Sequence, residues 1–160
     1  MEFPAVIIVV SLAVMVRGDS HVTAVCHMEQ NKQLSGSSSP KVTGKVTLVQ
    51  QTIGGPTQIT VDLKGLTTNS VHGFHIHNSG DIISRGCQSC GPHYRPDGTQ
   101  HAAPRDQKRH IGDLGNVMSN SKGEIKTAFI DYLVSLHGND SVIGRSIVIH
   151  ALRDDLGGAR

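Results

Sequence analysis

The sequence predicts an all-β protein, a sandwich or barrel of short strands, and three observations lead to this prediction. Apolar segments rich in valine, isoleucine and leucine recur along the chain, each short enough for one strand. Segments rich in glycine, serine and proline separate them, as at residues 35–40 and 54–56. No amphipathic helix, internal repeat or long linker competes with this pattern.

Seven segments are expected to form the strands. They are residues 21–28, 44–51, 58–66, 71–77, 115–118, 124–136 and 146–152. Tryptophan is absent and aromatic residues make up only 3% of the chain, so the core must consist of valine, isoleucine and leucine. A domain of about 140 residues can bury roughly two thirds of its surface without help from disulfides.

Histidine is concentrated in one part of the chain. Six of the ten histidines fall between His72 and His110. At the end of the expected strand 71–77, apolar residues alternate with histidine, so His75 and His77 should project from the same face, about 6 to 7 Å apart. Two imidazoles at this separation can bind one metal ion. The alternative is a pair of surface histidines on a half-buried strand.

Further candidate ligands follow in a segment that glycine and proline interrupt repeatedly, which predicts a loop. They are His93, His101, His110 and Asp113. The loop has few large apolar side chains to bury, so metal ligation would offset the entropy lost on ordering it. Three imidazoles with one carboxylate suit tetrahedral zinc, and an all-imidazole site with an open position suits copper.

These motifs together resemble the copper/zinc superoxide dismutases, over residues 73–157. The matching stretches are GFHIH, GCQSCGPHY, HAAPRDQKRHIGDLGN and IVIHALRDDLG, with weaker similarity at residues 24–26 and 46–66. Their order and spacing make the resemblance specific. It implies a Greek-key β-sandwich closed into a flattened barrel, with long metal-binding loops outside the barrel and against the strand that carries His75 and His77.

The resemblance also implies a role for each candidate ligand. The implied copper ligands are His75, His77, His93 and His150, and the implied zinc ligands are His93, His101, His110 and Asp113. His93 would be the catalytic residue, with its ring shared between the two ions. Asp154 matches the family's carboxylate that accepts a hydrogen bond from one ligand of each metal.

The implied reaction converts superoxide anion to oxygen and hydrogen peroxide by Cu(II)/Cu(I) cycling. After Leu156, however, the sequence departs from the family and stops at Arg160. We therefore expect a shortened C-terminus that lacks the family's charged, anion-steering loop, the arginine beside copper, a cysteine and the final strand. This would slow substrate capture and leave a barrel edge unpaired. The alternative function is a noncatalytic or impaired extracellular copper/zinc-binding protein.

The N-terminal segment predicts secretion. Residues 3–16 are almost wholly apolar and 17–20 are polar, which is typical of a signal peptide over 1–18 before a domain over 19–160. The apolar stretch is short for a membrane span, although a retained anchor remains the alternative because few positive charges precede it. The net charge of +2 and the lack of a basic, aromatic patch argue against nucleic acid as a partner. A homodimer is one expectation for the oligomeric state.

The chain has three cysteines, an odd number for a secreted protein. Cys26 is expected in the core of the first strand. Cys87 matches the family's loop cysteine, and with Cys90 it forms a Cys-x-x-Cys motif. A local disulfide, free thiols and soft ligands for Cu(I) all remain open for this pair. Asn139 begins a glycosylation sequon between two expected strands.

Overall fold

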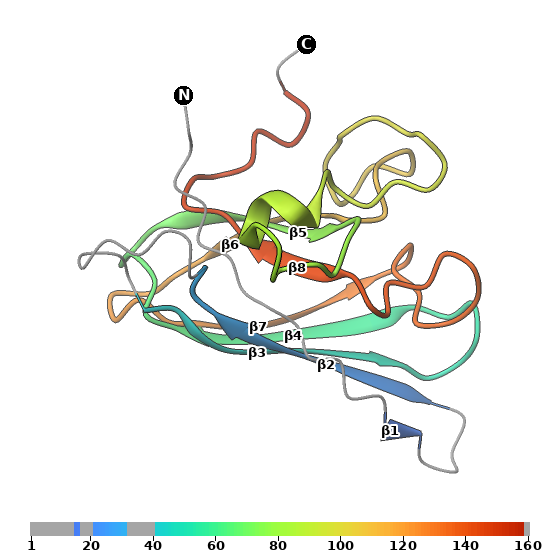
Figure 1. The fold of residues 1–160 in the computed structure, drawn as a ribbon, viewed down its shortest axis with the longest axis horizontal. Helices are drawn as coiled ribbons and strands as arrows, with labels where there is room; N and C mark the ends of the chain where they lie inside the picture. Colours follow the sequence, from blue (N-terminus) through green and yellow to red (C-terminus); the bar gives the residue numbers. More distant parts are fainter. Residues whose placement is uncertain (1–14, 17–20, 32–40, 159–160) are drawn as a thin grey trace.

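The computed structural model describes residues 15–16, 21–31 and 41–158, which form two antiparallel sheets packed as a sandwich (Figure 1). The first sheet has the order β1-β2-β3-β4-β7, with β1 at Met15–Val16, β2 at Val22–Glu29, β3 at Thr43–Gln50, β4 at Thr57–Lys64 and β7 at Ile125–Asp131. The second has the order β6-β5-β8, with β6 at Asp113–Met118, β5 at Val71–His77 and β8 at Ser146–Ile149. The predicted all-β fold is confirmed.

The core lies between the two sheets. Along β4, buried and exposed residues alternate without exception, so Ile59, Val61 and Leu63 all face inward. Across the sandwich, the Phe74 ring of β5 meets the Phe129 ring of β7 edge to face, with 6.4 Å between the ring centroids. Aliphatic side chains thus fill most of the core, as the composition predicts.

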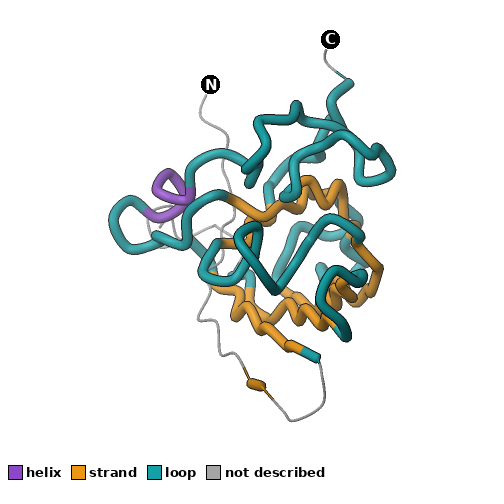
Figure 2. The backbone as a smooth tube through the Cα atoms, turned by 90° about the vertical axis from the view of Figure 1, so that its right-hand side faces the viewer, coloured by secondary structure: helices purple, strands orange, loops and turns teal. Residues whose placement is uncertain are grey.

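The order of the strands makes β5 the centre of the second sheet. The chain leaves the first sheet after β4, forms β5 and β6, and returns as β7 beside β4, which is a Greek-key connection. Because β6 and β8 flank β5, every residue of β5 after Val71 is buried. Viewed along the strands, the 3-10 turn η2, Gly86–Cys90, lies to one side of the strands (Figure 2).

Two strands end three or more residues earlier than the sequence predicts, while β3 and β4 end within two residues of their predicted ends. β7 stops at Asp131 instead of 136, because one carboxylate oxygen of Asp131 accepts hydrogen bonds from the amides of Leu133 and Val134 and turns the chain. β8 stops at Ile149 instead of 152. Beyond it the pairing with β5 continues only at Gly73, which bonds to the backbones of residues 150 and 152.

Some sequence predictions stay predictions. The signal peptide falls outside the described residues except for Met15 and Val16, whose backbones pair with β2. Within the part of the chain that the structure describes, no helix is both long and apolar enough to cross a membrane. Asn139 lies in an exposed turn, and its glycosylation is untested, as is the loss of a final strand.

Candidate metal centre

Strand β5 and the loop that follows it together position the candidate ligands. His75 and His77 come from β5, and His77 forms an antiparallel bridge with His93. Backbone hydrogen bonds at Ile76 hold the loop on both sides: the Tyr94 amide donates to the Ile76 carbonyl, and the Ile76 amide donates to the Gly112 carbonyl. A loop whose backbone is largely irregular outside η2 is therefore fixed against a strand.

Four imidazoles converge in a first set, and their ligand atoms all lie within 4.8 Å of one another. The set consists of His75, His77, His93 and His150. The ring centroid of His75 lies 3.9 Å from that of His93 and 4.9 Å from that of His150, so these three rings lie close together. His150, which follows β8, reaches this set because β8 pairs with β5.

A second set consists of His93, His101, His110 and Asp113. One carboxylate oxygen of Asp113 lies 2.8 Å from His93 Nδ1, 2.9 Å from His101 Nδ1 and 3.1 Å from His110 Nδ1. Tetrahedral zinc with ligands at about 2.0 Å needs ligand atoms about 3.3 Å apart, so a small expansion would admit the ion. His93 belongs to both sets.

The chemistry of the donor atoms fits metal binding in the first set. His77 Nδ1 donates to the Gly91 carbonyl at 2.7 Å, and His75 Nε2 lies 3.0 Å from Asp154 Oδ2. The remaining nitrogens, His75 Nδ1 and His77 Nε2, are buried without a hydrogen-bond partner, as is His150 Nε2. Buried polar atoms are nearly always paired, so three buried imidazole nitrogens without a protein partner, in residues whose ligand atoms lie within 4.8 Å of one another, fit ligation of a metal ion.

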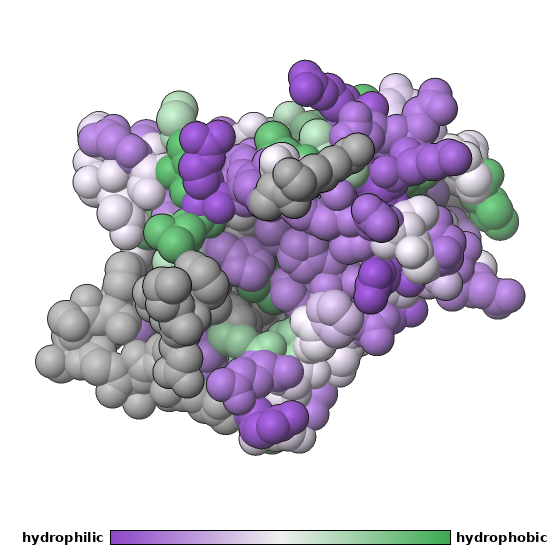
Figure 3. Space-filling model, turned by 90° about the horizontal axis from the view of Figure 1, so that it is seen from above, coloured by the Kyte–Doolittle hydropathy of each residue, from purple (hydrophilic) through white to green (hydrophobic). Residues whose placement is uncertain are grey.

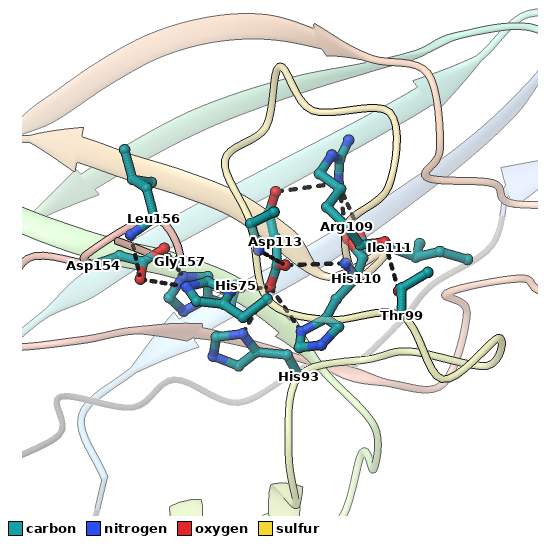
Figure 4. A network of polar contacts seen from close by, with 12 residues as sticks. His75, His93, Thr99, Arg109, His110, Ile111, Asp113, Asp154, Leu156 and Gly157 are labelled. Atoms are coloured by element: carbon teal, nitrogen blue, oxygen red, sulfur yellow. Dashed lines mark hydrogen bonds and ion pairs between the residues drawn. The ribbon is translucent and has the colours of Figure 1, made fainter. Parts of the chain in front are cut away.

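Asp154 connects the two sets, and Figure 4 shows its carboxylate directed toward His75. One oxygen accepts from His75 Nε2, and the other accepts from His101 Nε2 at 2.7 Å. The backbone of Asp154 is held in turn by Asn116, whose side chain donates to its carbonyl and accepts from its amide. The sequence indicated Asp154 but gave no signal for Asn116.

Arg109 is a second supporting residue that the sequence did not reveal. Its buried guanidinium donates to the backbone carbonyls of His110, Ile111 and Asp113 (Figure 4). It also forms an ion pair with Asp131 of β7. The turn that carries the second set is thereby fixed to the first sheet. No spacing rule connects an arginine in a loop with an aspartate 22 residues later.

Electrostatics keep the ligands ready to bind a cation. Burial, followed by the neighbouring histidines, lowers the pKa of His75 to about 3, and burial lowers those of His77 and His150 to about 3 and about 4. These imidazoles are therefore neutral at physiological pH, the form that binds metal. Burial acts to raise the pKa of Asp113, but hydrogen bonds led by that from His93 outweigh it and hold this pKa well below its ordinary value.

A cavity of about 420 Å³ opens over the shared histidine. His75, His93 and His150 line it together with Arg153 and Asp155. The side of the molecule above β5 in Figure 1, seen directly in Figure 3, is mainly hydrophilic. A small polar or anionic molecule could therefore reach the first set from solvent.

The cysteines do not take part in either set. Cys26, Cys87 and Cys90 are free thiols, and among the described residues no cluster of three or more donors includes a cysteine. The three interpretations of the Cys87–Cys90 pair stay predictions at this point.

These features describe a class of metalloprotein, in which a Greek-key sandwich carries two histidine-rich candidate ligand sets that share one imidazole. Residues 42–160 match the family described as copper/zinc superoxide dismutase. The chain belongs to the copper/zinc superoxide dismutase family, whose cofactors are copper and zinc. This confirms the predicted family.

Fungal relatives named superoxide dismutase (Cu-Zn) support the assignment. The chain is 48% identical to that of Candida glabrata over 124 residues, which cover 78% of this chain and 79% of the relative. It is 40% identical to that of Candida albicans over 148 residues, covering 92% and 82%, and 49% identical to that of Schizosaccharomyces pombe over 117 residues, covering 73% and 75%. These comparisons give no support to the alternative of a noncatalytic metal-binding protein.

Proposed function

We propose that this protein disproportionates superoxide, with two superoxide ions and two protons giving one oxygen molecule and one hydrogen peroxide molecule. The observation that carries the proposal is the convergence of two ligand sets on His93. Copper would be held by His75, His77, His93 and His150, and zinc by His93, His101, His110 and Asp113. Bound copper would supply the one-electron redox chemistry of the reaction, since it is stable as both Cu(II) and Cu(I).

The chain's own residues would orient the ligands and manage the proton. Asp113 contacts His93 at Nδ1, which leaves Nε2 of the same ring to face the first set. We assign to this Nε2 the uptake and release of a proton for the peroxide product. Asp154 holds the rings of His75 and His101, so one residue of each set keeps its orientation throughout.

The experiment that tests this function measures copper content, zinc content and superoxide turnover on the same purified protein. We expect one copper and one zinc per chain, with a turnover rate well above that of an equal concentration of free copper. Full loading with both metals and no turnover beyond free copper would eliminate the catalytic role. Loading of zinc alone would contradict the copper assignment.

We also propose that the protein is secreted after removal of residues 1–18. The support is the apolar stretch 3–16 followed by the polar residues 17–20. N-terminal sequencing of the protein from the medium of expressing cells should begin at residue 19. Recovery of the intact N-terminus from the cell pellet alone would contradict secretion.

A further inference from the structure

The Cys-x-x-Cys motif lies on the 3-10 turn η2, outside both ligand sets. Residues three apart in a 3-10 helix eclipse one another, and a rise of about 2 Å per residue puts their Cα atoms about 6 Å apart. Disulfides join Cα atoms that are about 4.4 to 6.8 Å apart. Cys87 packs against the small cluster formed by Cys90 and Val148, so the two side chains share one side of the turn.

The two thiols differ in their access to solvent. Cys90 is completely buried, whereas Cys87 is only partly buried. The side-chain amide of Asn31 donates a hydrogen bond to Cys87 Sγ at 2.8 Å, which stabilises negative charge on that sulfur. The pair therefore has one sulfur that an external reagent can reach and one that only its neighbour can reach.

We propose that Cys87 and Cys90 form a thiol–disulfide site that closes a local disulfide across η2, with a small organic disulfide as the oxidant. The Cys87 thiolate attacks one sulfur of that disulfide, which forms a mixed disulfide and releases one small thiol. Cys90 then loses its proton and attacks Cys87 Sγ, which forms the protein disulfide and releases the second small thiol. Two protein thiols are oxidised and one small disulfide is reduced.

The environment of the sulfurs makes this exchange slow. Burial raises the pKa of Cys87 to about 12 and raises the pKa of Cys90 above its ordinary value. Since the thiolate is the attacking species, little of either cysteine is reactive at neutral pH. The Cys87–Cys90 disulfide would therefore form slowly and be reduced slowly, unlike the disulfides of the low-pKa pairs in rapid thiol oxidoreductases.

The Cys87–Cys90 disulfide would affect the first ligand set through the backbone that follows Cys90. The Cys90 carbonyl accepts from the Ser79 amide at 2.8 Å, and the next carbonyl, that of Gly91, accepts from His77 Nδ1. The Cys90 side chain also packs on Val148, the residue paired with His75 across β5 and β8. Fixing the end of η2 thus fixes the group that orients His77, and the Ser79 amide should exchange its hydrogen more slowly in the oxidised protein.

The test uses the full metal-free chain, equilibrated in mixtures of oxidised and reduced glutathione, then denatured and alkylated. We expect the thiol count to fall from three to one per chain, with Cys26 as the remaining thiol and a peptide carrying an internal Cys87–Cys90 bond. Cys26→Ser should form the same bond. In Cys90→Ser, Cys87 should end as a mixed disulfide with glutathione.

Three results would overturn the proposal. They are three thiols that persist under oxidising glutathione, a disulfide that joins Cys87 to any cysteine other than Cys90, and a mixed disulfide at Cys87 that Cys90 never resolves. An unchanged exchange rate of the Ser79 amide would overturn the link to His77. Because the protein is metal-free and superoxide turnover is not measured, these outcomes are independent of the proposed enzymatic function.

Discussion

The guanidinium of Arg109 forms a buried ion pair with the carboxylate of Asp131, and this contact joins the metal-binding loop to the opposite sheet. The other nitrogens of Arg109 donate to four backbone carbonyls of the same loop, those of residues 104, 110, 111 and 113. Asp131 in turn caps the chain after β7. One pair of residues therefore determines both where β7 ends and where the second ligand set lies.

Replacing Arg109 with lysine should destabilise the protein by about 1 to 3 kcal/mol, because a single ammonium cannot serve these carbonyls and Asp131 at once and leaves buried acceptors without a donor. Urea unfolding of the metal-free protein measures this change, and zinc release to a chelator should be faster. Arg105→Lys is the matched control, since Arg105 is exposed on the same loop. Equal stability of the two variants would show that the buried pair is dispensable.

Replacing Asp154 with asparagine should weaken both metals together, by about 10- to 100-fold each, because one carboxylate orients His75 and His101. Competition with chelators of known affinity measures the two dissociation constants. Asp155→Asn makes the same change at the neighbouring residue and should have little effect on either affinity. The Asp155 side chain is 55% exposed, and its Oδ1 lies 3.7 Å from His101 Nε2. Loss of one metal alone in Asp154→Asn would contradict the linking role.

Replacing His93 with alanine should lower the affinity for copper and for zinc, because His93 belongs to both sets. The zinc loss should exceed the roughly 100-fold that removal of an outer partner costs. His77→Ala is the control, since His77 belongs only to the first set and should lower copper affinity alone. An unchanged zinc affinity in His93→Ala would count against a shared ligand.

The metal-free protein should lose stability as the pH falls from about 6.5 towards 4. Burial lowers the folded pKa of His75 and His77 to about 3 and of His150 to about 4, so in this range the unfolded chain binds protons that the folded chain does not. Each histidine contributes at most about 1.4 kcal/mol per pH unit. His101 opposes this trend. Burial acts to lower its pKa, but hydrogen bonds with Asp154 and Asp113 outweigh burial and raise it, so His101 stabilises the folded protein at low pH and this stabilisation is lost as the pH rises.

Urea unfolding at a series of pH values measures this dependence. His77→Gln should reduce the slope between pH 6.5 and 4, while His27→Gln, at an exposed position, should leave it unchanged. A stability that is constant over this range would mean that the buried imidazoles are not neutral in the folded state.

Arg153→Glu should slow superoxide capture by about two- to tenfold at low ionic strength. Arg153 is exposed and lines the cavity over the first set, where its positive charge attracts an anion. Pulse radiolysis at increasing salt should show the difference shrinking, since salt screens exposed charges. Arg105→Glu makes the same change in charge away from the cavity lining. If both variants lose rate equally, net charge and not position decides capture.

The fold class and the identity of the ligand candidates could be predicted from the amino-acid sequence alone. Strand alternation places His75 and His77 on one face, and glycine and proline mark the loop that carries His93 and His110, because both signals are local along the chain. The resemblance assigned His150 to the same set, although no spacing rule could have done so.

The contacts that hold these residues in place come from the packing of the two sheets. The pairing of β8 with β5 brings His150 to the first set, Asn116 fixes Asp154, and Arg109 ties the loop to β7. These contacts join residues that lie far apart in the sequence, from 22 positions for Arg109 and Asp131 to 75 positions for His75 and His150. Buried polar groups must find partners wherever the packed fold supplies them. Sequence periodicity carries no record of such long-range partners, so the supporting residues became visible only once the two sheets were packed together.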